Sequence, residues 1–464
     1  MDIGYILLNV AGLLVLAGIL FWMNRRHVSF SKRVFTGLGL GIVYGIVLHI
    51  SYGADGAALQ NSIPWFNIIG TGYIKLLQMI VVPLVFISIL TAFTKVAAGK
   101  NFGKQAAVIL GMLIGTTAIA AMLGIGSALL FNLNAEQIVQ GEAEAARGIS
   151  LEETASTVAD KALPDQLLDL LPANPFLDFT GARPTSTIGV VIFAAFLGFA
   201  FLAVRRKQPE QAAVVQKGID AVYALIMAVV KIVLRLTPYG ILAIMARTVA
   251  VSDYGAIVNL GKFVGASYAA LIVMFAVHLA ILALTGLNPL NYVKKAGDTL
   301  LFAFSSRSSA GTLPLTLTTQ TTRLGVPEGI ANFAGSFGLS IGQNGCAGIY
   351  PAMLAVMIAP TVGQPIDAQF IITLVAVVAI SSFGVAGVGG GATFAAILVL
   401  SALNLPIALA GILISVEPLI DMGRTALNVS GSMTAGVTAA RVTGELDTEQ
   451  YGEAMPRDPA VSEL

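Results

Sequence analysis

Charged residues are scarce in this sequence. They make up 11% of its 464 residues, whereas hydrophobic residues make up 56%, and a soluble domain carries about 25% charged residues. So few charges cannot cover the surface of a soluble globule of this length. The net charge of +1 also provides no basic footprint for nucleic acid, so we expect no nucleic-acid partner.

Cysteine and histidine are scarcer still. The single cysteine, Cys346, excludes a disulfide within the chain and a cysteine-rich metal site. The three histidines lie too far apart to give a metal-ligand spacing, and no plausible Ser/His pair is evident. An intramembrane enzyme is therefore the weaker alternative. We expect no enzymatic activity, no metal and no cofactor, and we interpret Cys346 as a small, unreactive residue.

The sequence contains several long runs of apolar residues without any charge. A helix needs roughly 20 apolar residues to cross a bilayer, and runs of about this length recur. The sequence therefore predicts an all-α polytopic membrane protein with lipid around it. The clearest runs are Gly4–Met23, Val34–Ile50, Gln105–Asn132, Thr185–Val204 and Val264–Val293.

The basic residues of the loops predict the orientation of the chain. Lysines and arginines cluster after Gly4–Met23, after the segment Ile63–Phe93 and after Thr185–Val204. Such basic loops stay on the cytoplasmic side. We therefore expect the N-terminus and the acidic connection Asn132–Arg183 outside, and a frayed polar tail, Glu445–Leu464, in the cytoplasm. Gly4–Met23 lacks the charged start of a cleaved signal peptide, so we interpret it as a retained helix.

Three segments do not fit simple spanning helices. Phe302–Leu317 and Ile380–Ile397 both place serine pairs and glycine inside apolar sequence. A pair of such segments is typical of a transporter's binding site, built from helical hairpins whose tips stop within the bilayer. Ser340–Pro351 contains three glycines, a proline and two amides, which predicts a broken helix. The alternatives are glycine surfaces for close packing and a kinked packing helix.

A charged face follows a long stretch without charge. Glu417, Asp421, Arg424 and Asn428 have spacings of 4, 3 and 4, which places them on one side of an α-helix. Each charge costs about 2.5–3.5 kcal/mol at mid-membrane, so we expect a function for them. In a zwitterion site, Arg424 would bind a carboxylate and Asp421 an ammonium, with Thr425 and Asn428 fixing orientation. The alternative is a structural Arg–Asp pair.

Four motifs carry a resemblance to a known family. FSSRSSAGTLP, SIGQNG, VAGVGGGAT and EPLIDMGRTALNVSG resemble the dicarboxylate/amino-acid:cation symporters over about Lys32–Thr443, with the bacterial L-cystine transporter branch closest. The resemblance implies the glutamate-transporter fold, with two re-entrant helical hairpins and a broken seventh family helix. It also implies a homotrimer in the bacterial inner membrane that imports its substrate by an elevator mechanism.

The same resemblance implies a division of the chain. Residues 1–30 form an extra N-terminal transmembrane helix, because the family plan lacks one there. Residues 31–285 form mainly scaffold and trimerisation helices, although parts of 63–131 belong to the transport domain. Residues 286–443 form the core of the transport domain, and 444–464 a polar cytoplasmic tail.

The substrate site is also carried over from the family, position by position. The first hairpin tip, the second tip (which acts as the extracellular gate) and the last helix each contribute, and Arg307 matches an arginine near the substrate-site carboxylates. The implied substrate-binding residues are Ser308, Ser309, Ala310, Ala386, Gly387, Val388, Glu417, Asp421, Arg424, Thr425 and Asn428.

Departures from the family pattern bear on the coupling ion. Sodium-coupled members carry Asn-Met-Asp-Gly-Thr where this chain has Gly342–Cys346, and an Asp where it has Ser432. Two of the family's three sodium sites thus lack their carboxylates. We therefore favour proton coupling through Glu417 or Asp421, with sodium as the alternative. A residual cation site would use Ser340, Ser382, Phe383 and Val385.

The charges of the site favour a particular substrate class. One arginine with two acids suits a zwitterion with more than one ammonium group, such as L-cystine, whereas a dicarboxylate does not need both Asp421 and Glu417. The alternatives are a sodium-coupled symporter of L-cystine, glutamate, aspartate or a dicarboxylate, and a passive anion channel.

Overall fold

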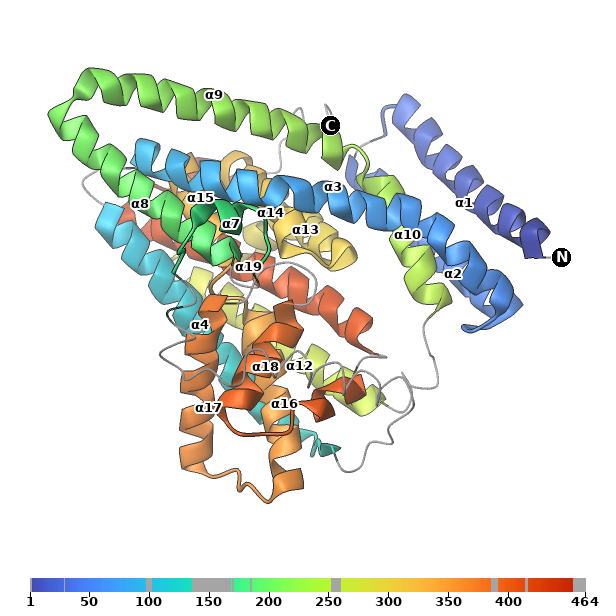
Figure 1. The fold of residues 1–464 in the computed structure, drawn as a ribbon. Helices are drawn as coiled ribbons and strands as arrows, with labels where there is room; N and C mark the ends of the chain where they lie inside the picture. Colours follow the sequence, from blue (N-terminus) through green and yellow to red (C-terminus); the bar gives the residue numbers. More distant parts are fainter. Residues whose placement is uncertain are drawn as a thin grey trace. The chain divides into compact units, whose positions relative to one another are not determined.

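A computed structural model describes residues 2–28, 30–96, 102–135, 168, 171–183, 186–251, 260–384, 391–413 and 416–453. The described residues are mainly helical and include no β-strand (Figure 1). They form two compact units. One takes its described residues from 2–81 and 225–251, and the other from 82–224 and 260–453.

Seven of the described helices are long and apolar enough to cross a bilayer. Four of them match uncharged runs of the sequence closely, which confirms a multi-pass α-helical membrane protein. Pro209–Val233 was not predicted, because Lys217, Asp220 and Lys231 interrupt it. The seven are Gly4–Arg25, Lys32–Tyr52, Gly103–Leu130, Ile188–Lys207, Pro209–Val233, Gly261–Leu284 and Asn344–Val362.

The uncharged run Val264–Val293 is divided between two helices. Helix α12 (Gly261–Leu284) ends inside it, and α13 (Pro289–Ser306) begins before its end. The side chain of Asn288 caps α13 by accepting a hydrogen bond from the Leu290 amide (3.0 Å). An Asn cap followed by proline is a strong start signal for a helix, and it outweighs the continuity of apolar residues.

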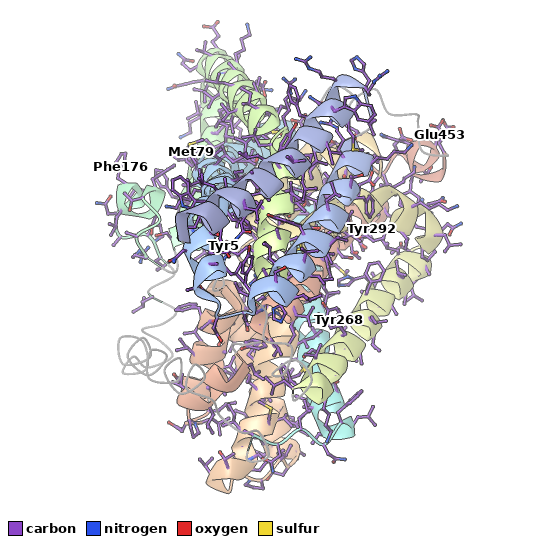
Figure 2. All side chains as sticks on the ribbon, turned by 90° about the vertical axis from the view of Figure 1, so that its right-hand side faces the viewer. Tyr5, Met79, Phe176, Tyr268, Tyr292 and Glu453 are labelled. Carbon is purple, nitrogen blue, oxygen red and sulfur yellow. The ribbon has the colours of Figure 1, made fainter. Side chains whose placement is uncertain are left out.

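The first unit fastens the additional N-terminal helix with buried polar contacts. Helix α1 (Asp2–Arg25) packs on α2 (Phe30–Tyr52) and α10 (Thr237–Ala250). Asn9 of α1 donates to the Ser62 hydroxyl (3.0 Å) of α3 (Ala57–Val96). The Asn9 carbonyl and side-chain oxygen accept from the tyrosines Tyr44 and Tyr52 of α2. The other face of helix α1 is apolar and exposed, for example at Tyr5 (Figure 2). Such a face is expected beside lipid.

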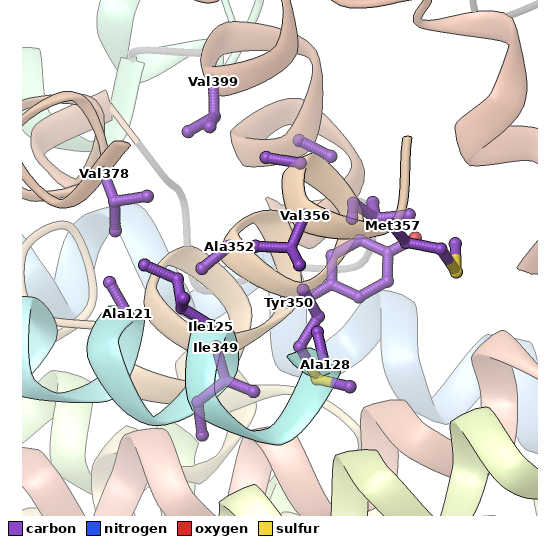
Figure 3. Close-up of a cluster of buried hydrophobic side chains, with 14 of the residues drawn as sticks. Ala121, Ile125, Ala128, Ile349, Tyr350, Ala352, Val356, Met357, Val378 and Val399 are labelled. Carbon is purple, nitrogen blue, oxygen red and sulfur yellow. The ribbon is translucent and has the colours of Figure 1, made fainter. Parts of the chain in front are cut away.

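The second unit is arranged around its last long helix, α19 (Glu417–Thr443), which packs against six other elements of that unit. A buried apolar cluster joins α4, the broken helix, α17 and α18 (Figure 3). The remaining helices are α4 (Phe102–Leu130), α7 (Pro175–Phe179), α8 (Ser186–Lys207), α14 (Ser309–Thr322), α15 (Glu328–Gly338), η2 (Asn344–Ile349), α16 (Tyr350–Ile358), η3 (Ala359–Val362), α17 (Ala368–Ser381), η4 (Ser382–Gly384), α18 (Gly391–Ala402), η5 (Ala408–Leu413) and α20 (Thr448–Gly452). Residues of α3 and of α9 (Pro209–Leu234) belong to both units.

Helical hairpins occur at both interrupted segments. Helices α13 and α14 pack on each other and are joined at Arg307, whose backbone is left-handed (φ 54°, ψ 31°). Helices α17 and α18 also pack on each other. The second tip, including Val385, Ala386, Gly387 and Val388, lies outside the described residues. That the tips stop within the bilayer stays a prediction.

The predicted break in Ser340–Pro351 is present. Helix α15 ends at Gly338, and the chain resumes at Asn344 as η2, one wide π-helical stretch that runs directly into α16. Such π segments are rare and recur at functional sites. Because the chain breaks before η2, the amides of its first turn have no partner within the helix. Two of them, those of Gly345 and Cys346, donate to Asn428 of α19.

The prediction of a frayed tail was wrong for its first residues. The Asp447 amide donates to the Gly325 carbonyl (2.9 Å), and the Tyr451 hydroxyl donates to the Asn288 carbonyl (3.0 Å). The Lys295 ammonium donates to the Tyr451 carbonyl (3.0 Å). Tyr451 is 2% exposed, and this burial raises the pKa of its phenol. Helix α20 is therefore docked beside hairpin α13–α14, while residues 454–464 lie outside the described residues.

Replacing Tyr451 by Ala should destabilise the protein by about 3–5 kcal/mol, because it empties a buried aromatic position. Tyr451→Phe keeps the ring and should cost only about 1 kcal/mol, the value of one hydrogen bond. Thermal unfolding in detergent measures both, with Tyr5→Ala, at a 48% exposed position, as the control. Equal midpoints for Tyr451→Ala and the control would contradict the docking of α20.

Candidate functional site

The predicted charged face is present on α19. The helix begins at Glu417, with a proline in its first turn, and continues past Asn428 without interruption. Arg424 is 1% exposed and is the largest fully buried side chain among the described residues. Thr425 and Asn428 are buried beside it. The face of α19 that the 4, 3 and 4 spacing defines is thus directed into the protein rather than toward solvent.

A chain of ion pairs connects this face to the first hairpin tip. Arg424 Nη2 donates to Glu417 Oε1 (2.5 Å) and to Asp421 Oδ1 (3.1 Å). The second oxygen of Asp421, Oδ2, accepts from Arg307 Nε (3.1 Å). The charges of two arginines and two acids therefore balance. The arrangement is larger than the isolated Arg–Asp pair that was the alternative interpretation. Because Arg307 forms the hairpin turn, Asp421 ties α19 to that tip.

The Arg424 guanidinium is only partly satisfied. Its Nε and Nη1 are buried and have no hydrogen-bond partner among the described residues. Its Cζ lies 4.3 Å from the ring centroid of Tyr350, the first residue of α16, which is cation–π distance. Buried donors of a charged group are costly to leave unpaired, so these nitrogens are suited to an acidic group of a ligand.

Asn428 has a different set of partners from the one expected. Its Oδ1 accepts from the amides of Gly345 (2.8 Å) and Cys346 (3.4 Å). Its Nδ2 donates to Gln343 Oε1 and Cys346 Sγ, both at 3.1 Å. Asn428 thus binds the broken helix to α19, and contact with substrate stays a prediction. Cys346 is buried and its sulfur accepts this hydrogen bond.

The first hairpin tip is built as a capped helix start. Ser308 Oγ accepts from the Gly311 amide (3.0 Å) and caps α14, and Ser309 and Ala310 are buried. A small cavity adjoins this tip between α14, α15 and α19. Its polar lining comes from Ser309, Thr316, Asn428 and Ser432.

The residues of the predicted cation site are only partly placed. Ser340 is buried and its hydroxyl has no partner among the described residues. The Ser382 hydroxyl donates to the Ala379 carbonyl (2.8 Å) at the end of α17. Phe383 lies in η4, and Val385 is outside the described residues. No hydrogen bond joins Ser340 to Ser382 within this part of the chain, so the site stays a prediction.

Sequence reasoning missed two buried contributors, Tyr350 and His278. Tyr350 is one of many aromatic residues, and nothing in the sequence marks it as the residue beneath Arg424. His278 was considered only as one of three histidines that lie too far apart to bind a metal. A signal for it did exist, because an ionisable residue inside a spanning helix marks a functional position by default. Its hydroxyl and amide neighbours, Ser430 and Asn344, come from distant segments. Tyr292, labelled in Figure 2, contacts the same Ser430 hydroxyl.

Comparison with known proteins identifies the family. The model of the sodium:dicarboxylate symporter family matches residues 30–442. The chain belongs to the sodium:dicarboxylate symporter family. This family has the glutamate-transporter fold, so the predicted fold class is confirmed, and the chain is a transporter rather than an enzyme. The additional helix α1 lies before the matched residues.

Relatives with nearly the same length are also known. The chain is 65% identical over 448 residues to the L-cystine uptake protein TcyP of Bacillus licheniformis, covering 96% of this chain and 97% of the relative. It is 63% identical over 454 residues to TcyP of Shouchella clausii, covering 98% and 97%. It is 60% identical over 447 residues to TcyP of Bacillus anthracis, covering 96% of each.

Gly345→Ala should disrupt the contact between η2 and α19. An added Cβ would lie 2.6 Å from Arg424 Cα and 2.8 Å from its Cβ, distances that force the two helices apart. We expect a loss of about 1–3 kcal/mol of stability, as for other overpacked positions, measured by thermal unfolding in detergent. Gly111→Ala in α4 is the matched control, because its Cβ would meet nothing within 4 Å. An unchanged midpoint for Gly345→Ala would contradict the close approach.

Proposed function

We propose that this transporter imports L-cystine by secondary active transport. The observation that carries the proposal is the buried Arg424, which lies between two acids on a face directed into the protein. Two of its nitrogens have no partner among the described residues. Relatives that are 60–65% identical over nearly their whole length are named L-cystine uptake proteins, which supports the choice of substrate.

In the proposed complex, each charge of one amino-acid half has a partner. The Arg424 guanidinium, whose Nε and Nη1 have no partner among the described residues, binds the α-carboxylate. Asp421 accepts the ammonium as Arg307 turns away. Ser308, Ser309 and Ala310 of the first tip, and Ala386, Gly387 and Val388 of the second, enclose the substrate. Glu417 adds a second acid for the second ammonium of L-cystine.

The charge balance of the site favours a zwitterion over a dicarboxylate. Arg307, Arg424, Glu417 and Asp421 sum to zero. L-Cystine, with two carboxylates and two ammonium groups, leaves this sum unchanged. A dicarboxylate, or an acidic amino acid such as glutamate, adds negative charge that the buried site must neutralise at a desolvation cost.

The proposed coupling ion is the proton. Substrate binding draws Arg424 or Arg307 away from an acid, and an acid without its cation in a buried site favours the protonated form. Glu417 and Asp421 are the two candidates to carry this proton. The alternative is a residual sodium ion at Ser340, Ser382, Phe383 and Val385, where main-chain carbonyls would supply most of the ligands.

The proposed transport cycle follows the family plan. Hairpins α13–α14 and α17–α18, the broken helix and α19 move together as an elevator in a homotrimer held by scaffold helices. The loop lysines and arginines support a cytoplasmic C-terminus and an outside N-terminus in the bacterial inner membrane.

Purified protein in liposomes preloaded with L-cystine should take up labelled L-cystine faster than empty liposomes, because a carrier returns faster when loaded. Arg424→Ala should lower this exchange by at least about 100-fold, since it removes a buried charge-assisted contact. Arg441→Ala, on the exposed end of the same helix, is the control and should exchange normally. Flux that internal substrate does not accelerate would refute the carrier. Full exchange by Arg424→Ala would refute the role of Arg424.

Uptake with separately imposed pH and sodium gradients tests the coupling. We expect an inward proton gradient alone to drive accumulation of L-cystine. Between Glu417→Gln and Asp421→Asn, the variant that keeps exchange but no longer responds to the pH gradient identifies the proton carrier. Accumulation that requires sodium and ignores the pH gradient would overturn proton coupling in favour of the residual cation site.

A further inference from the structure

His278 lies at the centre of a buried polar network outside the ion-pair chain. It belongs to α12 and is fully buried. Its Nδ1 lies 3.0 Å from Ser430 Oγ of α19, and its Nε2 lies 3.0 Å from Asn344 Oδ1 of η2. The imidazole thus bridges the last helix and the first residue of the broken helix.

The contacts of Asn344 determine which imidazole nitrogen carries the hydrogen. Asn344 Nδ2 lies 3.0 Å from Thr116 Oγ1 and 3.3 Å from Thr117 Oγ1. Both threonine hydroxyls donate to main-chain carbonyls of α4, at 2.7 and 2.8 Å, and therefore accept from the amide. This orientation leaves Oδ1, an acceptor only, facing His278. Nε2 must then be the protonated nitrogen.

The other side of the ring completes the pattern. With Nε2 protonated, a neutral imidazole accepts at Nδ1 from the Ser430 hydroxyl. The Tyr292 hydroxyl of α13 lies 3.0 Å from Ser430 Oγ and can donate to it, and Thr434 Oγ1 lies 3.5 Å from Tyr292. Every donor hydrogen of this hydrogen-bonded network has an acceptor. No member of the network has to carry a net charge. Among the described residues, Tyr292 is the only other titratable group in this network. No carboxylate of this part of the chain therefore contacts His278 in the network to offset a charged ring.

We propose that His278 is a positioning residue of the transport site. As a neutral ring, it holds η2 against α12 and α4 through Asn344, while Asn428 holds the next two amides of η2 from α19. Gly431 permits this packing, because a Cβ there would lie 2.4 Å from Asn344 Oδ1. Since Tyr350 directly follows η2, His278 sets the place of the ring beneath Arg424.

The lone cysteine provides a readout that does not depend on the substrate. Cys346 lies in η2, two residues after Asn344, and is 7% exposed. Its reaction with a small maleimide in detergent therefore reports how often η2 separates from its neighbours. His278→Phe should raise the labelling rate at least about tenfold, the expected consequence of losing buried hydrogen bonds. His278→Gln, which can supply one donor, should restore slow labelling. His49→Gln, outside this network, is the control.

A double-mutant cycle keeps the test independent of general damage. Asn344→Ala should raise the labelling rate as His278→Phe does, and the double variant should add little to either, because both remove the same contact. Rates should be compared well below each variant's unfolding midpoint. Additive effects, or unchanged labelling in His278→Phe, would overturn the proposal.

The consequences for transport rest on the proposed function and are measured separately. In proteoliposomes, His278→Phe should raise the KM for L-cystine at least about tenfold with a smaller effect on kcat, and His278→Gln should restore it. The pH-gradient response of His278→Gln should match that of the original protein. A loss of that response with unchanged Cys346 labelling would make His278 a proton carrier and overturn the neutral role. If the original protein does not transport L-cystine, the proposed function fails while the labelling result stands.

Discussion

The buried guanidinium of Arg424 is the constraint on which the second unit depends. A cation that is 1% exposed must be neutralised by groups that are already in place, since water cannot solvate it. Glu417 and Asp421 supply the negative charge from the same helix. Tyr350, the first residue of α16, lies with its ring face against the guanidinium. The helices therefore have to converge on one point, and α19 packs against six other elements of its unit.

The broken helix makes this convergence possible. Because η2 has no side chain at Gly345, its backbone lies directly against Arg424. Its free amides are bound by Asn428 and its first side chain by His278. An intact helix would have used those amides internally and kept α19 at ordinary helix–helix distance. The same interruption thus provides both the position of the arginine and the polar surroundings that stabilise it.

Sequence reasoning predicted features that depend on one segment and missed those that depend on several. The spanning helices follow from the length of uncharged runs. The shared face of Glu417, Asp421 and Arg424 follows from helical periodicity. Each of these is a property of a single segment. The docking of Tyr451 and the hydrogen bonds of His278 depend on partners distant in sequence. The hairpin tip residues came from family motifs, and local spacing alone does not assign them.

The two oxygens of Asp421 have a consequence for discrimination. Each is held by a different arginine, one on α19 and one at the turn between α13 and α14. In the proposed mechanism, only a molecule bearing an ammonium can replace either cation there. A compound of suitable size with carboxylates alone could still reach Arg424, yet it would leave the turn latched to α19. Such a compound would then bind and block movement without being transported.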